Sequence, residues 1–385
     1  LVCLLAGYTV FYDNGLGVDE NVHYDQVVRL ARGDWSMNPA LTMPPGVHAL
    51  LASVLTAVGP SVRSARLVLV LLAALTIVTF YLSVRARGHQ RPGIRTLQFT
   101  MLPILFHQFF LIYTDVVSLL CVLLMVRATM ARSLRVAGTL GLLACVMRQD
   151  NIVWAAWAVA WSYLDRYGWT WRPLREIVSE YWTFIATGGL FVGFVVANGG
   201  ELALGNDAGS HPTGILRLTN VLAMLGIAGV LFAPFWISRP RALTVLGDWK
   251  TWAVLGVFAA LFWFGFVNDH PHNNERADYF LPNAVLMAVA AGGVSKIVFL
   301  LVGALAVWGL RVARLPGAWW TLLPFSVLFL LPEWLVAPRY YLIPLTLFMV
   351  ARDDAPAPAE YAMAAVFAVA SAEIVMVMER GSGWV

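Results

Sequence analysis

The stretch RLVLVLLAALTIVTFYLSV, residues 66–84, decides the fold class of this chain. Apart from Arg66 at its start it carries no charge, and its length matches the roughly 20 apolar residues that a helix needs to cross a bilayer. The whole chain has the same character, because 60% of its 385 residues are apolar and only 12% are charged. Soluble domains have about 25% charged residues. The sequence therefore predicts an all-α, polytopic membrane protein.

Apolar runs recur along the chain, and we expect about 12 to 13 of them to cross the membrane. They cover residues 1–12, 66–84, 96–113, 115–131, 136–147, 151–164, 181–197, 214–237, 251–267, 297–310, 318–332, 338–350 and 361–378. We expect the first to be a clipped spanning helix. The run at 281–296 would break the alternation of sides, so we interpret it as a re-entrant or interfacial helix. Residues 1–385 are expected to form a single membrane-embedded domain.

The charges between these runs predict the orientation of the chain. With the N-terminus inside, most Lys and Arg residues fall on the cytoplasmic side and most Asp and Glu residues on the other, as the positive-inside rule expects. The net charge of +4 therefore gives no reason to expect nucleic acid as a partner. The three cysteines, Cys3, Cys121 and Cys145, lie in apolar runs and lack the spacing of a metal or disulfide framework.

The longest segment outside the runs, residues 13–60, is acidic and rich in Pro and Gly, and we expect it to be the functional outer loop. It contains amphipathic pieces at 21–32 and 47–58, with TMPPG (residues 42–46) as a turn before the second. Asp19 and Glu20 are adjacent carboxylates directly beyond the first run. A partly desolvated carboxylate can act as a general base toward a hydroxyl. The alternative is a solvated helix N-terminus, where acidic residues are favoured anyway.

A second group of polar residues is bordered on both sides by apolar sequence. It comprises Asp115 together with Arg148, Gln149 and Asn151. We expect the stretch from Arg148 to Asn151 to lie in a cavity. Ionisable residues at membrane depth are costly and usually line a pathway or site. An internal ion pair between Asp and Arg is the alternative.

Three later outer segments carry further candidates: 198–212 with His211, 268–280 with Arg276, and 338–344 with Arg339 and Tyr340. A guanidinium group offers a planar fork of donors that suits phosphate. Anchoring at lipid headgroups is the alternative for the last segment. His270 and His272 are separated by one proline and have no Cys or second His pair beside them, so we predict no metal site although Asp269 is adjacent. A carboxylate base with cations for a leaving phosphate suits transfer from a lipid phosphate, without a nucleotide or other cofactor.

Several of these segments, in the same order, resemble the landmarks of the dolichyl-phosphoglucose-dependent α-1,2-glucosyltransferases, which add the terminal glucose to the N-glycan precursor. They are VDENVHYDQVVRLARGDW and NPALTMPPG in the first loop, then YTD (113–115), MRQDNIVWA (147–155), VVANGGELALGNDAGSH (195–211), NNERADYF (273–280) and RYYLIP (339–344). The resemblance implies a GT-C glycosyltransferase fold. The chain departs from the family pattern at Asp150, where Thr is usual, at Ala277, where His is usual, and at Ala337, where Glu is usual.

By this resemblance, Asp19 or Glu20 is the catalytic base, and Arg148, Arg276 and Arg339 are candidates for the phosphate groups of lipid-linked substrates. The predicted substrate-binding set is Asp115, Arg148, Gln149, Asn151, His211, Arg276, Arg339 and Tyr340. The implied function is inverting transfer of a hexose, preferably glucose in α-1,2 linkage, from a polyprenyl or dolichyl phosphate sugar to a lipid-linked glycan or other acceptor. The other expected partners are membrane lipids.

The Ala/Arg-rich composition and short cytoplasmic loops favour a prokaryotic relative in the plasma membrane, with the endoplasmic reticulum as the eukaryotic counterpart. The active site is expected on the extracytoplasmic or lumenal side. Two alternatives stay open: a related GT-C mannosyl- or aminoarabinose-type transferase, and a multi-span transporter or flippase. Transporters commonly contain internal repeats. We find no such repeat, and the long acidic loop favours an enzyme.

Overall fold

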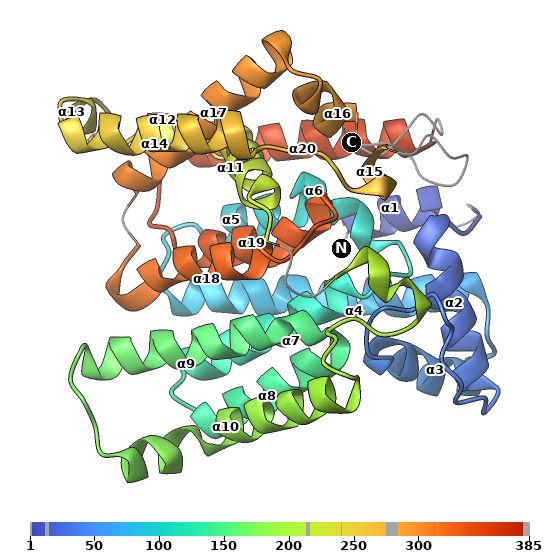
Figure 1. The fold of residues 1–385 in the computed structure, drawn as a ribbon. Coiled ribbons are helices and arrows are strands. Elements are labelled where there is room, and N and C mark those ends of the chain that lie inside the picture. Colours follow the sequence, from blue (N-terminus) through green and yellow to red (C-terminus); the bar gives the residue numbers. More distant parts are fainter. Residues whose placement is uncertain are drawn as a thin grey trace. The chain divides into compact units, whose positions relative to one another are not determined.

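The computed structural model describes residues 2–11, 15–212, 216–239, 241–274, 284–313 and 315–379, and these ranges contain helices and no strand (Figure 1). The prediction of an all-α fold is confirmed. Four helices in these ranges are long and apolar enough to cross a membrane, namely α4 (Val62–Ala86), α10 (Leu174–Ala197), α17 (Gly293–Val312) and α20 (Ala357–Glu379). They support an integral membrane protein. The expected total of 12 to 13 crossings stays a prediction.

The other predicted runs also lie on helices, which are shorter or broken. They are α1 (Val2–Phe11), α7 (Asp115–Met130), α8 (Leu134–Met147), α9 (Ile152–Tyr167), α11 (Thr219–Leu231), α12 (Ala233–Ile237), α14 (Trp249–Gly265), η4 (Gly317–Thr321), α18 (Leu322–Leu330) and α19 (Leu342–Ala351). The run at 96–113 is divided into α5 (Pro92–Thr100), α6 (Pro103–Phe106) and η1 (His107–Phe109). Pro103 has no N–H for a continuing helix, so the break there has a local cause.

The helix predicted at 281–296 ends earlier in the structure than the sequence suggests. Helix α16 (Ala284–Ala290) ends before Gly292 and Gly293, which have φ of 87° and 67°. Such values suit glycine and interrupt a helix. Lys296 therefore belongs to α17 rather than to the expected re-entrant segment, while residues 281–283 lie outside the described ranges.

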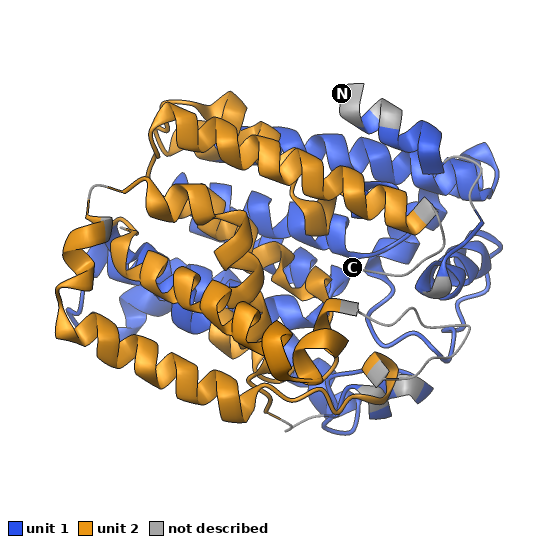
Figure 2. Ribbon diagram, turned by 90° about the horizontal axis from the view of Figure 1, so that it is seen from above, with its two compact units in different colours: residues 1–83, 107–213, 317–325 blue, residues 84–106, 214–316, 326–385 orange. Residues whose placement is uncertain are grey.

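The chain divides into two compact units (Figure 2). Unit 1 contains residues 1–83, 107–213 and 317–325, and unit 2 contains residues 84–106, 214–316 and 326–385. The single embedded domain expected from the sequence stays a prediction.

Unit 1 is built on α7 to α10, which pack against one another. The short connections at 131–133 and 148–151 make α7, α8 and α9 antiparallel neighbours. A buried aromatic cluster packs α9 against η4. In this cluster the ring centres of Trp157 and Trp161 are 5.2 Å apart, and those of Trp161 and Trp319 are 4.4 Å apart. Consequently the polar loops of this unit are carried at the ends of a rigid bundle.

Unit 2 is built around α17, which packs against α11, α12 and α14. Helices α11 and α17 approach closely at Gly229, where a Cβ atom would lie 2.0 Å from the carbonyl oxygen of Val302. Small residues allow such close contact between membrane helices.

A buried charge cluster, missed by the sequence analysis, joins α5, α19 and α20 in the same unit. Arg352 donates to both oxygens of Glu360 at 2.7 and 2.9 Å. Glu360 also accepts from Gln98 at 2.8 Å and from Arg95 at 3.3 Å. The four side chains are at most 2% exposed.

Candidate functional site

The predicted outer loop at residues 13–60, called the first loop below, contains α2 (Val18–Ala31) and α3 (Gly46–Val58), which pack against each other where the sequence predicts two amphipathic helices. TMPPG forms the turn before α3, as expected. Its glycine, Gly46, lies against the last turn of α8, where a Cβ atom would approach the carbonyl oxygen of Val146 to 2.4 Å. The turn therefore brings the first loop beside the end of α8 that precedes Arg148.

The two adjacent carboxylates of this loop have different surroundings. Asp19 and Glu20 both lie in the first turn of α2, where the helix dipole favours negative charge. Asp19 is half-buried, whereas Glu20 is 1% exposed. This distinction could not be drawn from sequence.

Glu20 is fully engaged by the protein. Its Oε1 accepts from the backbone N–H of Ile112 at 2.8 Å, and its Oε2 accepts from that of Gly17 at 2.9 Å. Arg66 donates to both oxygens at 3.2 and 3.0 Å, and also to the carbonyl of Phe11 at 2.6 Å. Glu20 thus fastens the start of α2 to α4 and to the segment before α7.

The second predicted group forms a charged cluster of three side chains. Arg148 has extended backbone (φ −151°, ψ 125°) between α8 and η2 (Gln149–Asn151). It donates to Asp115 at 3.2 Å and to Asp150 at 3.0 Å. The ion pair considered from the sequence is therefore present. Because two carboxylates face one guanidinium, the cluster has an excess negative charge.

Gln149 and Asn151 hold neighbouring segments together. Gln149 donates to the carbonyls of Thr42 at 3.0 Å and Leu202 at 3.1 Å, so it joins the first loop to the segment at 198–212. Asn151, which is fully buried, donates to Ser118 Oγ and to the carbonyl of Ala144, both at 2.8 Å. Both amides therefore fix the backbone around Arg148.

The segment at 198–212 also contacts the first loop directly. The backbone N–H of Asn206 donates to the carbonyl of Pro39 at 2.7 Å. Gly205 has φ of +71°, and a Cβ atom there would lie 2.5 Å from the same carbonyl oxygen, so glycine is required. His211 follows η3 (Asn206–Ser210) and is half-buried. Three predicted groups thus gather at one end of unit 1.

A buried pair of histidines lies in the same unit. The sequence did not predict that these two side chains come together. His23 Nδ1 and His48 Nε2 are 2.8 Å apart, and the ring of Tyr113 meets that of His23 at 5.6 Å. Burial, and then the neighbouring His23, lower the pKa of His48 well below its usual value, which keeps His48 neutral. A single histidine in an apolar helix gives no sequence signal for such a pair.

In unit 2, the segments at 268–274 and 331–341 meet. Asn273 donates to the carbonyl of Val336 at 3.0 Å and accepts from its N–H at 2.9 Å. Asp269 accepts from Trp334 at 2.8 Å and from Arg217 at 2.7 Å. Burial would raise the pKa of Asp269, but these two hydrogen bonds outweigh it and lower the pKa, so Asp269 is charged at neutral pH.

The remaining predicted residues of this unit are placed only in part. Arg339 and Tyr340 lie in η5 (Pro338–Tyr341), with the Arg339 guanidinium 5.8 Å from the centre of the Tyr340 ring. Tyr340 is buried and Arg339 half-buried. Arg276 lies outside the described residues.

Within the described ranges, no group of three or more His, Cys, Asp or Glu residues could hold a metal ion. The rings of His270 and His272 are 5.1 Å apart, and that of His270 meets Trp334 at 4.6 Å. Metal independence stays a prediction.

Comparison with known proteins places these residues in context. The model of the DIE2/ALG10 family matches residues 15–173. The family resemblance seen in the sequence is confirmed. The Dol-P-Glc:Glc(2)Man(9)GlcNAc(2)-PP-Dol alpha-1,2-glucosyltransferase of Homo sapiens is 23% identical to this chain over 409 residues, which covers 89% of the chain and 84% of that relative. No solved structure matches.

The range that matches the DIE2/ALG10 family contains the first loop and the Arg148 cluster. His211, Arg339 and Tyr340 lie beyond it. The family match therefore covers two of the three groups that gather in unit 1, and the segment at 198–212 lies beyond it.

Proposed function

We propose that this chain is an inverting, metal-independent glucosyltransferase of the membrane. It moves glucose, in α-1,2 linkage, from a polyprenyl or dolichyl phosphate to a lipid-linked glycan on the extracytoplasmic or lumenal face. The observation that carries the proposal is the DIE2/ALG10 match over residues 15–173, the range containing the acidic loop and the Arg148 cluster. The donor, acceptor and linkage are proposed by analogy with the human relative.

Asp19 is the proposed catalytic base. Of the two adjacent carboxylates it is the one that keeps solvent exposure, while Glu20 is buried against Arg66 and two backbone N–H groups. Asp19 takes the proton of the acceptor hydroxyl, whose oxygen forms a bond to the anomeric carbon of glucose. The bond from that carbon to the phosphate oxygen breaks, and the polyprenyl phosphate leaves with the electron pair and a second negative charge.

The other residues are proposed to bind substrate or to position those that do. Arg276 and Arg339 stabilise the charge of the lipid phosphates, since guanidinium provides bidentate donors. Asp115 and Arg148 contact a substrate directly, and His211 in unit 1 and Tyr340 in unit 2 are the further proposed substrate-binding residues. Gln149 and Asn151 act through the backbone that they hold in place. Glu20 positions Asp19 by fixing the first turn of α2.

The test is a product assay on the purified full chain. Polyprenyl-phosphoglucose is incubated with lipid extracts, and mass spectrometry follows the glucosylated product together with free polyprenyl phosphate. Asp19→Asn should lower kcat by about 10²-fold or more, as expected for loss of a general base, with an unchanged unfolding temperature. Glu20→Gln should lower the unfolding temperature, because it leaves buried Arg66 without its carboxylate.

Full activity of Asp19→Asn would contradict the assignment of Asp19 as the catalytic base. The product assay also separates the other functions considered. A transporter or flippase would release no free polyprenyl phosphate, and a mannosyl- or aminoarabinose-type transferase would accept those donors in place of polyprenyl-phosphoglucose.

A further inference from the structure

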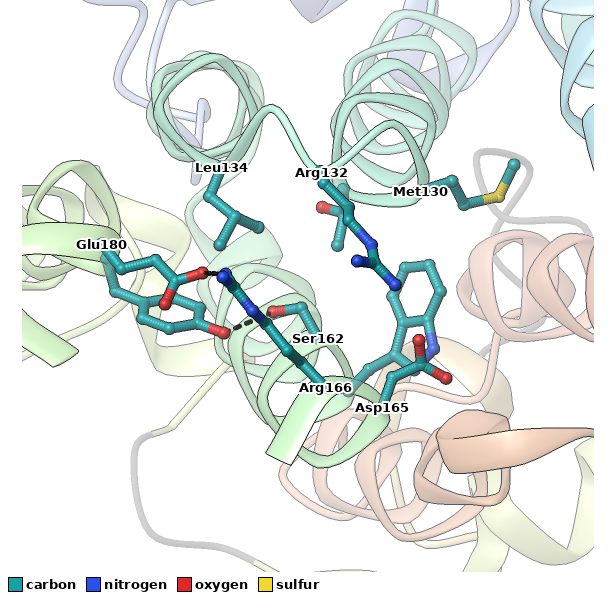
Figure 3. Close-up of a pocket in the computed structure, with 10 residues that line it drawn as sticks. Met130, Arg132, Leu134, Ser162, Asp165, Arg166 and Glu180 are labelled. Carbon is teal, nitrogen blue, oxygen red and sulfur yellow. Dashed lines mark hydrogen bonds and ion pairs between the residues drawn. The ribbon is translucent and has the colours of Figure 1, made fainter. Parts of the chain in front are cut away.

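A cavity of about 60 Å³ lies in unit 1 at the end opposite the Arg148 cluster (Figure 3). Helix α7 runs from Asp115 to Met130, and the residues around Met130 line this cavity together with the end of α9 and part of α10. Sixteen residues of helix span roughly 24 Å. The cavity is therefore separate from the proposed site of glucosyl transfer.

Arg132 lines the cavity from a strained backbone position. Its φ is +57°, and it is the one residue other than glycine with positive φ among those described. The N–H of Arg132 donates to Thr129 and that of Ser133 to Ala128, the pattern that closes a helix with glycine at this place. An arginine there costs about 1 kcal/mol of strain. In the part of the chain that the structure describes, its guanidinium has no hydrogen bond or ion pair.

Two other polar groups face the same cavity without partners in the described ranges. Trp161 is 5% exposed, and its Nε1 is buried with no acceptor. Asp165 lines the cavity and makes no ion pair with Arg132, whereas Arg166 is taken by Glu180. In Figure 3, Arg132 extends from the end of α7 toward the side of the cavity that carries Asp165, and no interaction joins them. Both Arg132 and Asp165 are exposed, and neither has an ion pair in the described ranges.

Asp165 also lines a second, adjacent cavity of about 180 Å³. Trp169 and Trp320 line it as well, with ring centres 6.5 Å apart and exposed fractions of 82% and 45%. Exposed tryptophans are typical of the membrane interface. A carboxylate between indole rings suits a cation, because the faces of the rings attract positive charge.

We propose that these two cavities bind the headgroup of phosphatidylethanolamine. The phosphate is held by Arg132 and by Trp161 Nε1, and the primary ammonium by Asp165 beside Trp169 and Trp320. The ligand carries one negative and one positive charge, which complement Arg132 and Asp165, and its ammonium has N–H groups that can donate to the Asp165 carboxylate, whereas the ammonium of phosphatidylcholine has none. This lipid site is independent of the glucosyl transfer proposed above.

The experiment uses the purified full chain in detergent with phosphatidylethanolamine, phosphatidylcholine or phosphatidylglycerol of equal acyl chains, and native mass spectrometry measures the bound fraction. Phosphatidylethanolamine should bind at least about tenfold more tightly than phosphatidylglycerol. Arg132→Gly should weaken its binding by about tenfold or more through loss of charged hydrogen bonds. The same variant should unfold at an equal or higher temperature, because glycine relieves the positive φ. A structural role for Arg132 predicts the opposite shift in unfolding temperature.

Asp165→Asn should weaken binding similarly and abolish the preference for the ethanolamine lipid over phosphatidylglycerol. Arg135→Ala and Glu176→Gln are matched controls, since both residues are exposed at the same end of the bundle and line neither cavity. They should bind phosphatidylethanolamine within twofold of the original chain. Equal binding by Arg132→Gly, a preference for phosphatidylglycerol, or equal losses in the controls would each overturn the proposal.

Discussion

The two units each hold a cluster of charges inside apolar surroundings, and the clusters differ in how completely those charges are satisfied. In unit 2, Glu360 accepts from Arg352, Arg95, Gln98 and the backbone N–H of Ala355. In unit 1, Arg148 is shared between Asp115 and Asp150, with side-chain exposures of 13%, 7% and 19%. Oδ2 of Asp115 is buried and has no partner among the described residues.

This difference separates a structural role from a binding role. A buried carboxylate whose acceptor positions are all filled has no free lone pair for a ligand. Removing that carboxylate leaves its buried cationic partners unpaired. A cluster with a surplus carboxylate oxygen and partial exposure can take a hydroxyl or another polar group of a substrate. We therefore propose that the Glu360 cluster stabilises the fold and that the Arg148 cluster binds substrate, and the following variants test that division.

The largest effect is expected from Glu360→Gln. It leaves the guanidiniums of Arg95 and Arg352 buried without this shared carboxylate, and removing one partner of a buried pair costs about 3–5 kcal/mol. We expect a clearly lower midpoint of thermal unfolding in detergent. Glu373→Gln is the control, because Glu373 is exposed on the same helix and has no ion pair in the described part of the chain. Equal midpoints for the two variants would contradict the structural assignment.

An intermediate effect is expected from Asp115→Asn, and it should appear in substrate binding. The change removes a charged acceptor while Arg148 keeps Asp150, so the fold should persist. A hydrogen bond to a charged group contributes about 1.5–3 kcal/mol, which corresponds to a KM raised about tenfold or more. The KM values for donor and acceptor should be measured separately, together with kcat. An unchanged KM for both, with lower kcat alone, would place Asp115 in the chemical step instead.

The fold could be predicted from sequence to the extent that it depends on local hydrophobicity. Long apolar runs such as 66–84 predict helices whatever surrounds them, and the structure has α4 there. The breaks between helices were harder to predict from sequence. The glycines at 292 and 293, for example, divide a run whose apolar composition alone favours one helix. In membrane proteins, composition predicts the helices better than it predicts where they end.

The site could be predicted only as a set of residue types. The sequence proposed Asp19 with Glu20 but could not distinguish them, because the difference arises from Arg66, 46 residues away. The Glu360 cluster was missed for the same reason, since Arg95 and Glu360 are 265 residues apart. Charged side chains that lie far apart in sequence show no local pattern, so their pairing becomes visible only in the folded chain.

The smallest effect is expected from Asp150→Thr, which introduces the residue that the family usually has at this position. Asp150 is the more exposed partner of Arg148, with its side chain 19% exposed against 7% for Asp115, so its loss should cost less than the loss of Asp115. Arg148 keeps Asp115, so the unfolding temperature should change little. Removing the surplus negative charge should also favour an anionic lipid phosphate near Arg148. We therefore expect the KM for polyprenyl-phosphoglucose to fall by up to about threefold, with kcat unchanged. If activity instead drops more than tenfold, Asp150 itself contacts substrate, and the surplus charge of the cluster is part of the binding site.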